Sequence, residues 1–447
     1  MLSSLTIKER ALDLGFDLAG IAPIALWKDL KFSRQWVEKG FHGKMRYLEN
    51  PKRFDPRLVL PSAKSVICVG LIYNTPLPYS SFQPAVPATA PPAAWVSRYA
   101  WGQDYHAIMR AKLEQLRAAL EELAPGVDTR AFVDTGPVVE RAFARFSGIG
   151  WMGKNTCIIN EEKGSWIFLG VILTSVELAP DLPAPDRCGS CRACLQACPT
   201  GALVEPYVMD ASRCISYLTI EIKGAIPERF RSKIGAHVFG CDICQEVCPW
   251  NDSRQSSVVS GQLPAASHQP SAVSYQQGPP RREQSPDERR AEGAATTKLP
   301  QFHPMEATTI HPALEDGGVP KQLTTDHGKQ ATNNGQRATV IDNAQDTADN
   351  GPRATDNGRR TVEAASFSLF NPRLDQLALI SEDNFRRIFA TSPIKRAKYR
   401  GWLRNLCVAM GNSGDERFVP WLEQAGQHSD PMVREHATWA IGRLRKK

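Results

Sequence analysis

The chain has 447 residues, which is enough for two or three domains, because one domain usually takes roughly 100 to 200 residues. Its longest apolar run, residues 166–176, is shorter than the ~20 residues needed to cross a bilayer, so we expect no membrane span. The N-terminal residues show neither a secretory signal nor a twin-arginine run, which predicts a cytoplasmic protein. Eleven cysteines in a reducing compartment favour metal or redox chemistry over structural disulfides.

The first part of the chain, residues 1–185, alternates helical and strand-like patterns. Residues 3–15 are amphipathic with a helical period, and four apolar runs have the length and composition of strands: 65–73, 129–135, 155–160 and 165–175. Such alternation predicts a mixed α/β domain. The Pro- and Ala-rich residues 76–94 indicate a surface loop within it.

Residues 186–251 hold eight of the eleven cysteines. The first four follow the spacing Cys-x2-Cys-x2-Cys-x3-Cys-Pro of bacterial ferredoxins, whose fourth cysteine binds the neighbouring cluster when two are present. A second group with matching spacing follows, so the sequence predicts a ferredoxin-like domain with two 4Fe-4S clusters. We assign one cluster to Cys188, Cys191, Cys194 and Cys248, and the other to Cys198, Cys214, Cys241 and Cys244.

Zinc is the alternative for this region, since structural zinc sites also use paired Cys-x2-Cys sequences around one tetrahedral ion. Three cysteines at steps of three followed by Cys-Pro, twice over, fit zinc poorly. The remaining cysteines, Cys68, Cys157 and Cys407, lie in apolar runs and are expected to be buried core residues.

The glycine-rich residues 148–155, GIGWMGKN, satisfy G-x-G-x-x-G and nearly match a Walker A loop. Both motifs require a strand before and a helix after, whereas residues 138–148 have a helical pattern, and Asn155 stands where Ser or Thr would bind magnesium. We therefore reject nucleotide binding. The stretch is expected to be a tight helix-to-strand connection or a close backbone approach to a large, flat ligand.

Residues 252–365 are polar, nearly free of aromatic residues and without apolar periodicity, which predicts a disordered insert. Helical patterns resume over 366–447, and the last helices resemble a pair of HEAT-type repeats. Residues 391–447 carry eleven Lys and Arg against five Asp and Glu. This surplus either binds a phosphate-bearing partner or forms an ordinary solvated helical face, and the charge alone leaves both open.

Asp134 ends a strand-like run and precedes Thr-Gly-Pro and a helical pattern. It is either a residue that caps the helix or closes a turn, or a general acid at the end of a strand. These residues by themselves do not decide between the two.

The sequence resembles the epoxyqueuosine reductases, cobalamin- and iron-sulfur-dependent enzymes that perform the last step of queuosine synthesis on tRNA. The resemblance covers nearly everything outside residues 252–365. The blocks that carry it are RFDPRLVLPSAKSVICVGLIYN, SRYAWGQDYH, FVDTGPVVERAFARFSGIGWMGKNTCIIN, CGSCRACLQACPTGAL, CISYLTIEIKG, CDICQEVCPWN and SPIKRAKYRGWLRNLCVAMGN.

The resemblance implies an α+β multidomain protein: an α/β domain binding cobalamin over 1–185, a two-cluster domain over 186–251, and a HEAT-like tRNA-binding domain over 366–447. It implies that Asp134 is the proton donor for reductive opening of the epoxide, and we expect burial against the corrin to raise its pKa. Expected cobalamin contacts are Arg57, Ser97, Tyr105, His106, Lys154 and Asn155, although His106 could equally be a structural histidine.

The expected partners are tRNA carrying epoxyqueuosine and an unidentified electron donor, for a monomer that does not bind membranes. Five basic residues fall on one or two adjacent helical turns where they could meet phosphates of an anticodon stem-loop: Lys395, Arg396, Lys398, Arg400 and Arg404. An alternative is another cobalamin and iron-sulfur reductase, such as a reductive dehalogenase, but those enzymes usually carry an export signal and would not need a basic helical tail. A non-catalytic electron-transfer or tRNA-binding module would have no use for the large α/β domain.

Overall fold

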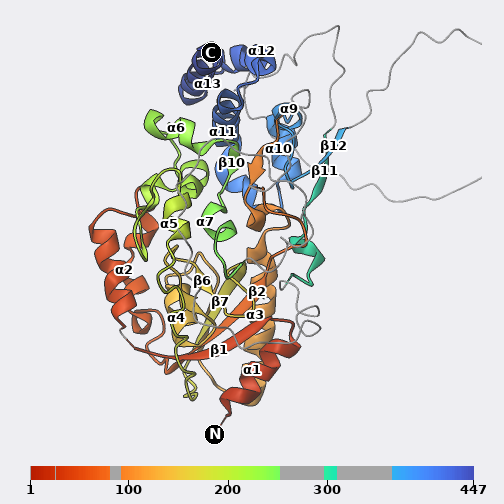
Figure 1. The fold of residues 1–447 in the computed structure, drawn as a ribbon. Coiled ribbons are helices and arrows are strands. Elements are labelled where there is room, and N and C mark those ends of the chain that lie inside the picture. The colour runs from red at the N-terminus through yellow and green to blue at the C-terminus, as the bar shows by residue number, and fades with distance from the viewer. Residues whose placement is uncertain (1, 26, 81–91, 252–295, 310–364, 447) are drawn as a thin grey trace, which may run out of the picture.

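A computed structural model describes residues 2–25, 27–80, 92–251, 296–309 and 365–446. A four-stranded sheet forms one end of the molecule, the C-terminal helices form the other, and the cysteine-bearing helices lie between them (Figure 1). No helix within the described residues combines the length and the apolar character that a bilayer span needs.

The sheet has the order β1-β2-β7-β4, and all its neighbouring strands are antiparallel. Alternating helices and strands usually produce parallel strands, so this antiparallel arrangement is a feature that the pattern did not indicate. The strands are β1 (Leu18–Pro23), β2 (Ser65–Ile72), β4 (Thr129–Phe132) and β7 (Ile167–Thr174).

Helices cover both faces of this sheet, which explains why every residue of β2 is buried although an antiparallel strand often leaves one face in water. Ile67 and Val69 pack on the face covered by α1 and α3, whereas Val66 and Cys68 pack on the opposite face with α4. The helices of this part are α1 (Ser4–Asp13), α2 (Lys28–Glu38), α3 (Tyr105–Leu123) and α4 (Glu140–Phe146).

The glycine-rich stretch is a tight helix-to-strand connection, as predicted. Helix α4 ends at Phe146, Gly148 adopts a φ of 74°, and strand β5 (Trp151–Met152) follows and pairs with β6 (Ile158–Ile159). The helix precedes the strand, which is the reverse of the order in both nucleotide-binding motifs.

The cysteine-rich region consists of short elements whose loops carry the thiols. Its strand β10 pairs in parallel with β3 (Trp95–Val96), far away in the sequence. The elements are α5 (Ala193–Ala197), β8 (Leu203–Glu205), β9 (Val208–Met209), a π-helical turn (Tyr217–Glu221), α6 (Glu228–Ile234), β10 (His237–Phe239) and α7 (Ile243–Glu246).

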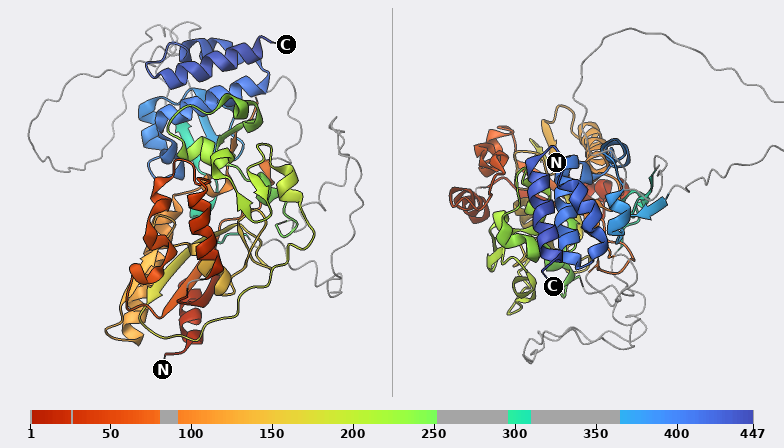
Figure 2. Two further views of the ribbon diagram at one scale, coloured as in Figure 1. Left: turned by 90° about the vertical axis from the view of Figure 1, so that its left-hand side faces the viewer. Right: turned by 90° about the horizontal axis from the view of Figure 1, so that it is seen from above.

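The C-terminal helices stack side by side in the view from above (Figure 2). Helix α11 ends where Gly414 adopts the left-handed conformation, and α13 begins where Asp430 caps its first turn. The helices are α9 (Leu374–Ala378), α10 (Glu382–Ile388), α11 (Lys398–Ser413), α12 (Val419–Ala425) and α13 (Pro431–Leu444). Short 3-10 turns occur at Arg46–Glu49, Pro51–Phe54, Pro56–Leu58, Arg98–Ala100, Ala211–Arg213, Pro300–Phe302, Pro393–Ala397 and Glu416–Phe418.

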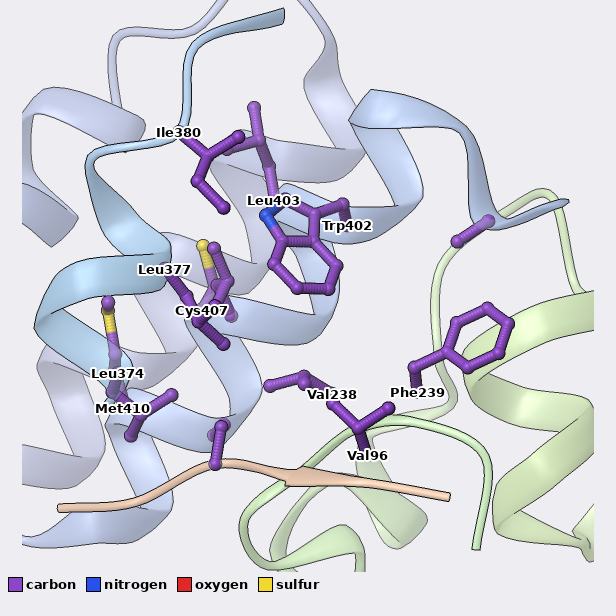
Figure 3. Close-up of a cluster of buried hydrophobic side chains, with 14 of the residues drawn as sticks. Val96, Val238, Phe239, Leu374, Leu377, Ile380, Trp402, Leu403, Cys407 and Met410 are labelled. Carbon is purple, nitrogen blue, oxygen red and sulfur yellow. The ribbon is translucent and has the colours of Figure 1, made fainter. Parts of the chain in front are cut away.

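A single buried cluster joins these helices to the other two parts of the chain. Figure 3 shows Trp402 and Cys407 of α11 facing Val238 of β10 and Val96 of β3. The C-terminal helices are therefore packed onto the cysteine-rich region through a continuous apolar core. Cys68 and Cys407 are buried core residues, as expected.

Part of the predicted disordered insert is folded, so that prediction was wrong for residues 296–309. Phe302 is buried against Phe168 of β7, and the main-chain N–H of Thr297 donates to the oxygen of Asn74. Strand β11 (Glu306–Thr309) pairs with β12 (Ala365–Ser368). The buried phenylalanine and the main-chain hydrogen bonds hold residues 296–309 against the rest of the protein although their composition is polar. The rest of the insert, and residues 81–91 of the predicted surface loop, lie outside the described residues.

Candidate functional site

Two sets of four cysteines gather in the cysteine-rich region, and they are the two sets expected from the spacing. Burial raises the pKa of Cys194 to about 11, and the neighbouring thiols of Cys188 and Cys191 contribute. Burial likewise raises the pKa of Cys248 to about 12, with contributions from Cys188 and Cys194. Cys248 thus lies with the first three cysteines although it belongs to the second sequence group.

The second set is arranged in the same way. Burial raises the pKa of Cys241, and the nearby thiols of Cys214 and Cys198 add to the effect. The thiols of Cys241 and Cys214 also contribute to raising the pKa of the Cys244 thiol. Within the described residues, no three His, Cys, Asp or Glu side chains converge closely enough to hold a single metal ion. In a 4Fe-4S cluster each of four thiolates binds a different iron, so a set of four cysteines supplies the ligands that one such cluster needs.

The glycine-rich connection supports both cysteine sets, which the sequence analysis did not foresee. The ammonium of Lys154 donates to the main-chain oxygen of Cys191 at 2.8 Å, and Asn155 donates to that of Cys244 at 3.0 Å. Both side chains are almost fully buried. These two residues, expected to contact cobalamin, hold the loops that carry the thiols.

Cys157 is not simply a core residue, which corrects the expectation made for it. Its thiol lies within hydrogen-bonding reach of Cys244, and its main-chain N–H donates to Oδ1 of Asn155 at 3.1 Å. Ser97, another expected cobalamin contact, donates at 2.6 Å to the buried carboxylate of Asp242. In the sequence, Asp242 stands between Cys241 and Cys244.

Asp134 lies in the loop between β4 and α4 with a φ of 54°, a conformation that costs energy for a residue other than glycine and is common at functional sites. Its Oδ2 atom is 3.3 Å from Nε2 of His106, and the hydroxyl of Tyr105 also reaches its carboxylate. The other ring nitrogen of His106 is 2.7 Å from Oδ1 of Asp104. Tyr105 and His106, expected at the cofactor, therefore surround the proposed proton donor.

The charges around Asp134 oppose the raised pKa that we expected. The partial burial of its side chain would by itself raise the pKa of Asp134, but the hydrogen bond from His106 and the charges of Arg396 and Arg141 outweigh this effect and hold the pKa below its usual value. Burial would lower the pKa of His106, but its hydrogen bonds to Asp104 and Asp134 raise it to about 9. In this arrangement the proton of the pair resides on the imidazole.

Two basic residues from the C-terminal part complete this cluster. Nζ of Lys395 is 2.9 Å from Oδ2 of Asp104, and a guanidinium nitrogen of Arg396 is 3.6 Å from Oδ2 of Asp134. Arg396 also pairs with Glu221 at 2.8 Å. The 3-10 turn Pro393–Ala397 thus brings two of the predicted tRNA-binding residues to the predicted catalytic residue.

The other predicted tRNA-binding residues differ in accessibility. Arg404 is 1% exposed and donates to three main-chain oxygens, so it is not available to phosphate in this arrangement. Arg400 is exposed but donates to Asp430 and to the main-chain oxygen of Lys223. Lys398 is exposed at the start of α11. Helical spacing could not distinguish these cases, because it does not show which face another segment covers.

A cavity of about 610 Å³ lies beside α4, the helix that follows the Asp134 loop. Trp36 and Trp151 give it apolar walls, Arg141 and Arg145 contribute positive charge, and Tyr207 belongs to the cysteine-rich region. Its size lies within the range of roughly 300 to 1,000 Å³ that cofactor pockets occupy. Arg57, which was expected at the cofactor, is exposed, pairs with Asp55 at 3.0 Å and does not line this cavity.

Glu140, the first residue of α4, has a buried carboxylate oxygen without a hydrogen-bond partner among the described residues. Burial and the charge of Asp134 raise its pKa to about 7. The apolar walls and basic residues of the cavity fit a large cofactor with apolar faces and polar edges. Sequence reasoning missed Asp104, Glu140 and Arg141, although Asp104 stands two residues before His106 at a helix start.

Comparison with known protein families gives two matches. Residues 187–251 match the family described as 4Fe-4S double cluster binding domain, and residues 53–135 match the family described as Epoxyqueuosine reductase QueG, DUF1730. A curated epoxyqueuosine reductase of Pseudomonas aeruginosa is 34% identical over 446 residues, which covers 98% of this chain and 93% of the relative.

Solved structures of similar proteins have the same overall architecture. An epoxyqueuosine reductase in complex with an epoxyqueuosine-modified stem-loop of tyrosine tRNA superposes with a TM-score of 0.68 at 26% identity, covering 98% of this chain and 89% of the other. An epoxyqueuosine reductase from Bacillus subtilis, whose catalytic aspartate loop is swung out of the active site, gives the same TM-score and identity and covers 98% and 90%.

Proposed function

Because this chain belongs to the epoxyqueuosine reductase family, we propose that it reduces epoxyqueuosine to queuosine in tRNA and that Asp134 donates a proton in this reaction. The observation that carries the proposal is the position of Asp134. Its side chain is 47% exposed in the loop that precedes α4, and residues of both the α/β part and the C-terminal part contact it. An enzyme acting on tRNA would work in the cytoplasm.

Reduction of the epoxide to an alkene consumes two electrons and two protons and releases water. We propose that the eight cysteines hold two 4Fe-4S clusters, which supply electrons one at a time. Cobalamin, when bound, would supply a metal centre able to attack an epoxide carbon. The residues that would hold it are those lining the cavity, with Trp36 and Trp151 against its apolar parts and Arg141 and Arg145 beside its polar groups.

The protein's own part of the chemistry is the handling of protons. Opening an epoxide leaves negative charge on its oxygen, and protonation by a carboxylic acid avoids expelling a free alkoxide. Asp134 would donate this proton from its carboxyl group, whose Oδ2 atom lies 3.3 Å from Nε2 of His106. The positive charges of Arg396 and Arg141 would stabilise the carboxylate that remains.

The C-terminal helices are proposed to bind the tRNA stem-loop as a HEAT-type unit, with Lys398 and Arg400 at its exposed start. A base in a loop can be turned outward into an active site, which is how enzymes usually reach a nucleobase. Because the turn that precedes α11 also carries Lys395 and Arg396, tRNA bound there would lie next to Asp134. We propose that the chain acts as a monomer with domain limits near residues 185, 251 and 366.

The test is turnover by protein reconstituted anaerobically with iron, sulfide and cobalamin, using tRNA that carries epoxyqueuosine and a strong reductant. Mass spectrometry of the digested nucleosides should show the loss of one oxygen mass with the unchanged protein. Asp134→Asn should lower the rate about 10²- to 10⁴-fold, because an amide cannot donate the required proton. Iron content and the visible spectrum of bound cobalamin serve as controls. Full turnover by the Asn variant would exclude Asp134 as the donor, and no conversion by the unchanged protein would exclude the substrate.

A further inference from the structure

His106 connects two carboxylates that come from different parts of the α/β domain. Its Nδ1 is 2.7 Å from Asp104, which caps the start of α3, and its Nε2 is 3.3 Å from Asp134, which follows β4. The ring stacks on Tyr105 with their centroids 4.2 Å apart, and Tyr105 itself stacks on Phe168 of β7. The imidazole is therefore fixed in a position where both ring nitrogens face acceptors.

Two other buried histidines show what a structural role looks like in this protein. The Nδ1 atoms of His237 and His436 bind the main-chain oxygens of Ile234 and Met432. Burial lowers the pKa of each to about 4, so both rings are neutral. His106 differs because its partners are carboxylates, which favour the doubly protonated ring.

We propose that His106 is the proton reservoir that reloads Asp134, which rests on the proposed function of this site. The step is a proton transfer without change of oxidation state: the N–H bond at Nε2 of His106 breaks and an O–H bond forms at Oδ2 of Asp134. This O–H bond then breaks as the proton passes to the epoxide oxygen, where a new O–H bond forms. Solvent then returns a proton to the imidazole. The side chain of His106 is 14% exposed and that of Asp134 is 47% exposed, so water reaches the pair.

The charged groups around this pair come from every element packed against it. Asp104 faces Nδ1 and is itself paired with Lys395 of the C-terminal part. Asp134 faces Nε2 and is flanked by Arg396 of the same turn, by Arg141 and Glu140 of α4, and by the Tyr105 hydroxyl. Because Arg396 and Arg141 favour the ionised form of Asp134, the carboxyl group needs a proton source at hand when the epoxide opens.

The protonation of His106 and Asp134 also depends on two basic residues from the C-terminal part. Lys395 competes with His106 for Asp104, and Arg396 competes with it for Asp134. A tRNA phosphate that drew either basic side chain away would make the carboxylate it leaves a stronger acceptor for the imidazole proton. The turn that is proposed to meet the substrate thus also supplies the basic residues that contact both carboxylate partners of His106.

The test uses the full chain with both clusters and cobalamin, in single turnovers of an epoxyqueuosine-modified stem-loop between pH 6 and pH 10. The unchanged protein should lose activity as the pH rises through about 9, where the imidazole gives up its proton. His106→Gln keeps a side-chain N–H but cannot titrate, so its rate at neutral pH should be about 10- to 100-fold lower and should lack this alkaline decline. Added imidazole should restore part of the rate to His106→Gly.

A second readout does not depend on turnover. Histidine-ring NMR of the protein should show one imidazole titrating with a pKa well above the ordinary value, and Asp104→Asn should bring it down and move the alkaline decline of the rate to lower pH. His303→Gln is the control, because His303 is an exposed histidine that follows the 3-10 turn Pro300–Phe302. Its rate and pH profile should equal those of the unchanged protein.

The outcomes separate this inference from the proposed function. If Asp134→Asn is inactive while His106→Gln keeps the full rate and the alkaline decline, the reservoir role is excluded and the proposed function stands. A slow His106→Gln with an unchanged alkaline decline would make His106 only a positioning residue. If His106→Gln fails to bind iron and cobalamin, the Asp104→Asn profile decides, and an unmoved decline overturns the inference. If the unchanged protein reduces no epoxyqueuosine, the proposed function itself fails.

Discussion

The guanidinium of Arg404 on α11 donates at 2.8 Å to the main-chain oxygen of Ile222, a residue 182 positions earlier in the chain. It also donates to the oxygens of Gly224 and Leu218, and Asn405 beside it donates to the oxygens of Thr219 and Val238. These hydrogen bonds satisfy the carbonyls around the π-helical turn of the cysteine-rich region. They fix how the C-terminal helices sit relative to the clusters.

Arg404→Met should therefore destabilise the protein by roughly 2 to 4 kcal/mol, because it leaves buried carbonyl oxygens without donors. Denaturant unfolding followed by tryptophan fluorescence measures the change. Arg400→Met is the matched control on the same helix, because its side chain is 53% exposed, and its loss should cost less than about 1 kcal/mol. Equal losses for the two variants would contradict a structural role specific to Arg404.

Lys398→Gln should weaken binding of the tRNA stem-loop without changing stability. If Lys398 neutralises one phosphate, the slope of log affinity against log salt should become shallower by about 0.7 to 0.9. Fluorescence anisotropy over a range of salt concentrations measures this slope. Lys64, an exposed lysine beside β2, provides the control, and Lys64→Gln should leave the slope unchanged. A slope for Lys398→Gln equal to that of the unchanged protein would remove Lys398 from the interface.

The cysteine sets predict which substitutions disable the same cluster. Cys188→Ser and Cys248→Ser should remove the same signal from the electron paramagnetic resonance spectrum of the reduced protein, although they belong to different sequence groups. Cys198→Ser should remove the other signal, and each variant should lose about half of the iron. Cys407→Ser, in the apolar core, should keep both clusters. Loss of the same signal in Cys198→Ser and Cys248→Ser would contradict this division.

Glu140 should make the cobalamin-free protein less stable as the pH rises. Its pKa is about 7 in the folded chain and lower when unfolded, so the folded state holds more protons between about pH 4.5 and pH 7 and stability falls across this window. Glu140→Gln removes this cost and should stabilise the protein at pH 8 by about 1 to 3 kcal/mol, with little effect near pH 4.5. Thermal unfolding at both pH values checks this. A constant difference at the two pH values would show that Glu140 does not titrate in this way.

The strands and helices with strong local patterns were predictable from the sequence. The apolar runs at 65–73 and 165–175 are the two central strands, and the helical patterns predicted over 366–447 correspond to the helices from α9 onward. The two cysteine sets also followed from spacing, because ferredoxin-like loops fix which thiols meet. These features depend on contacts within short stretches or on one repeated motif.

The composition of residues 296–309 did not show that they are folded, because a single phenylalanine docked on a distant strand decides it. The sequence predicted Lys395, Arg396 and Arg404 on one or two adjacent helical turns facing phosphates, whereas in the tertiary structure they contact two carboxylates and buried carbonyl oxygens.

The sequence by itself determined the local elements, the cysteine sets and the family of this protein, since each depends on residue types at fixed spacing. Only the tertiary structure decided the protonation of Asp134. Its pKa depends on His106, Arg141 and Arg396, which come from three separate segments, and on the balance between their charges and burial. That balance is a property of distances across the fold, and no local pattern encodes it.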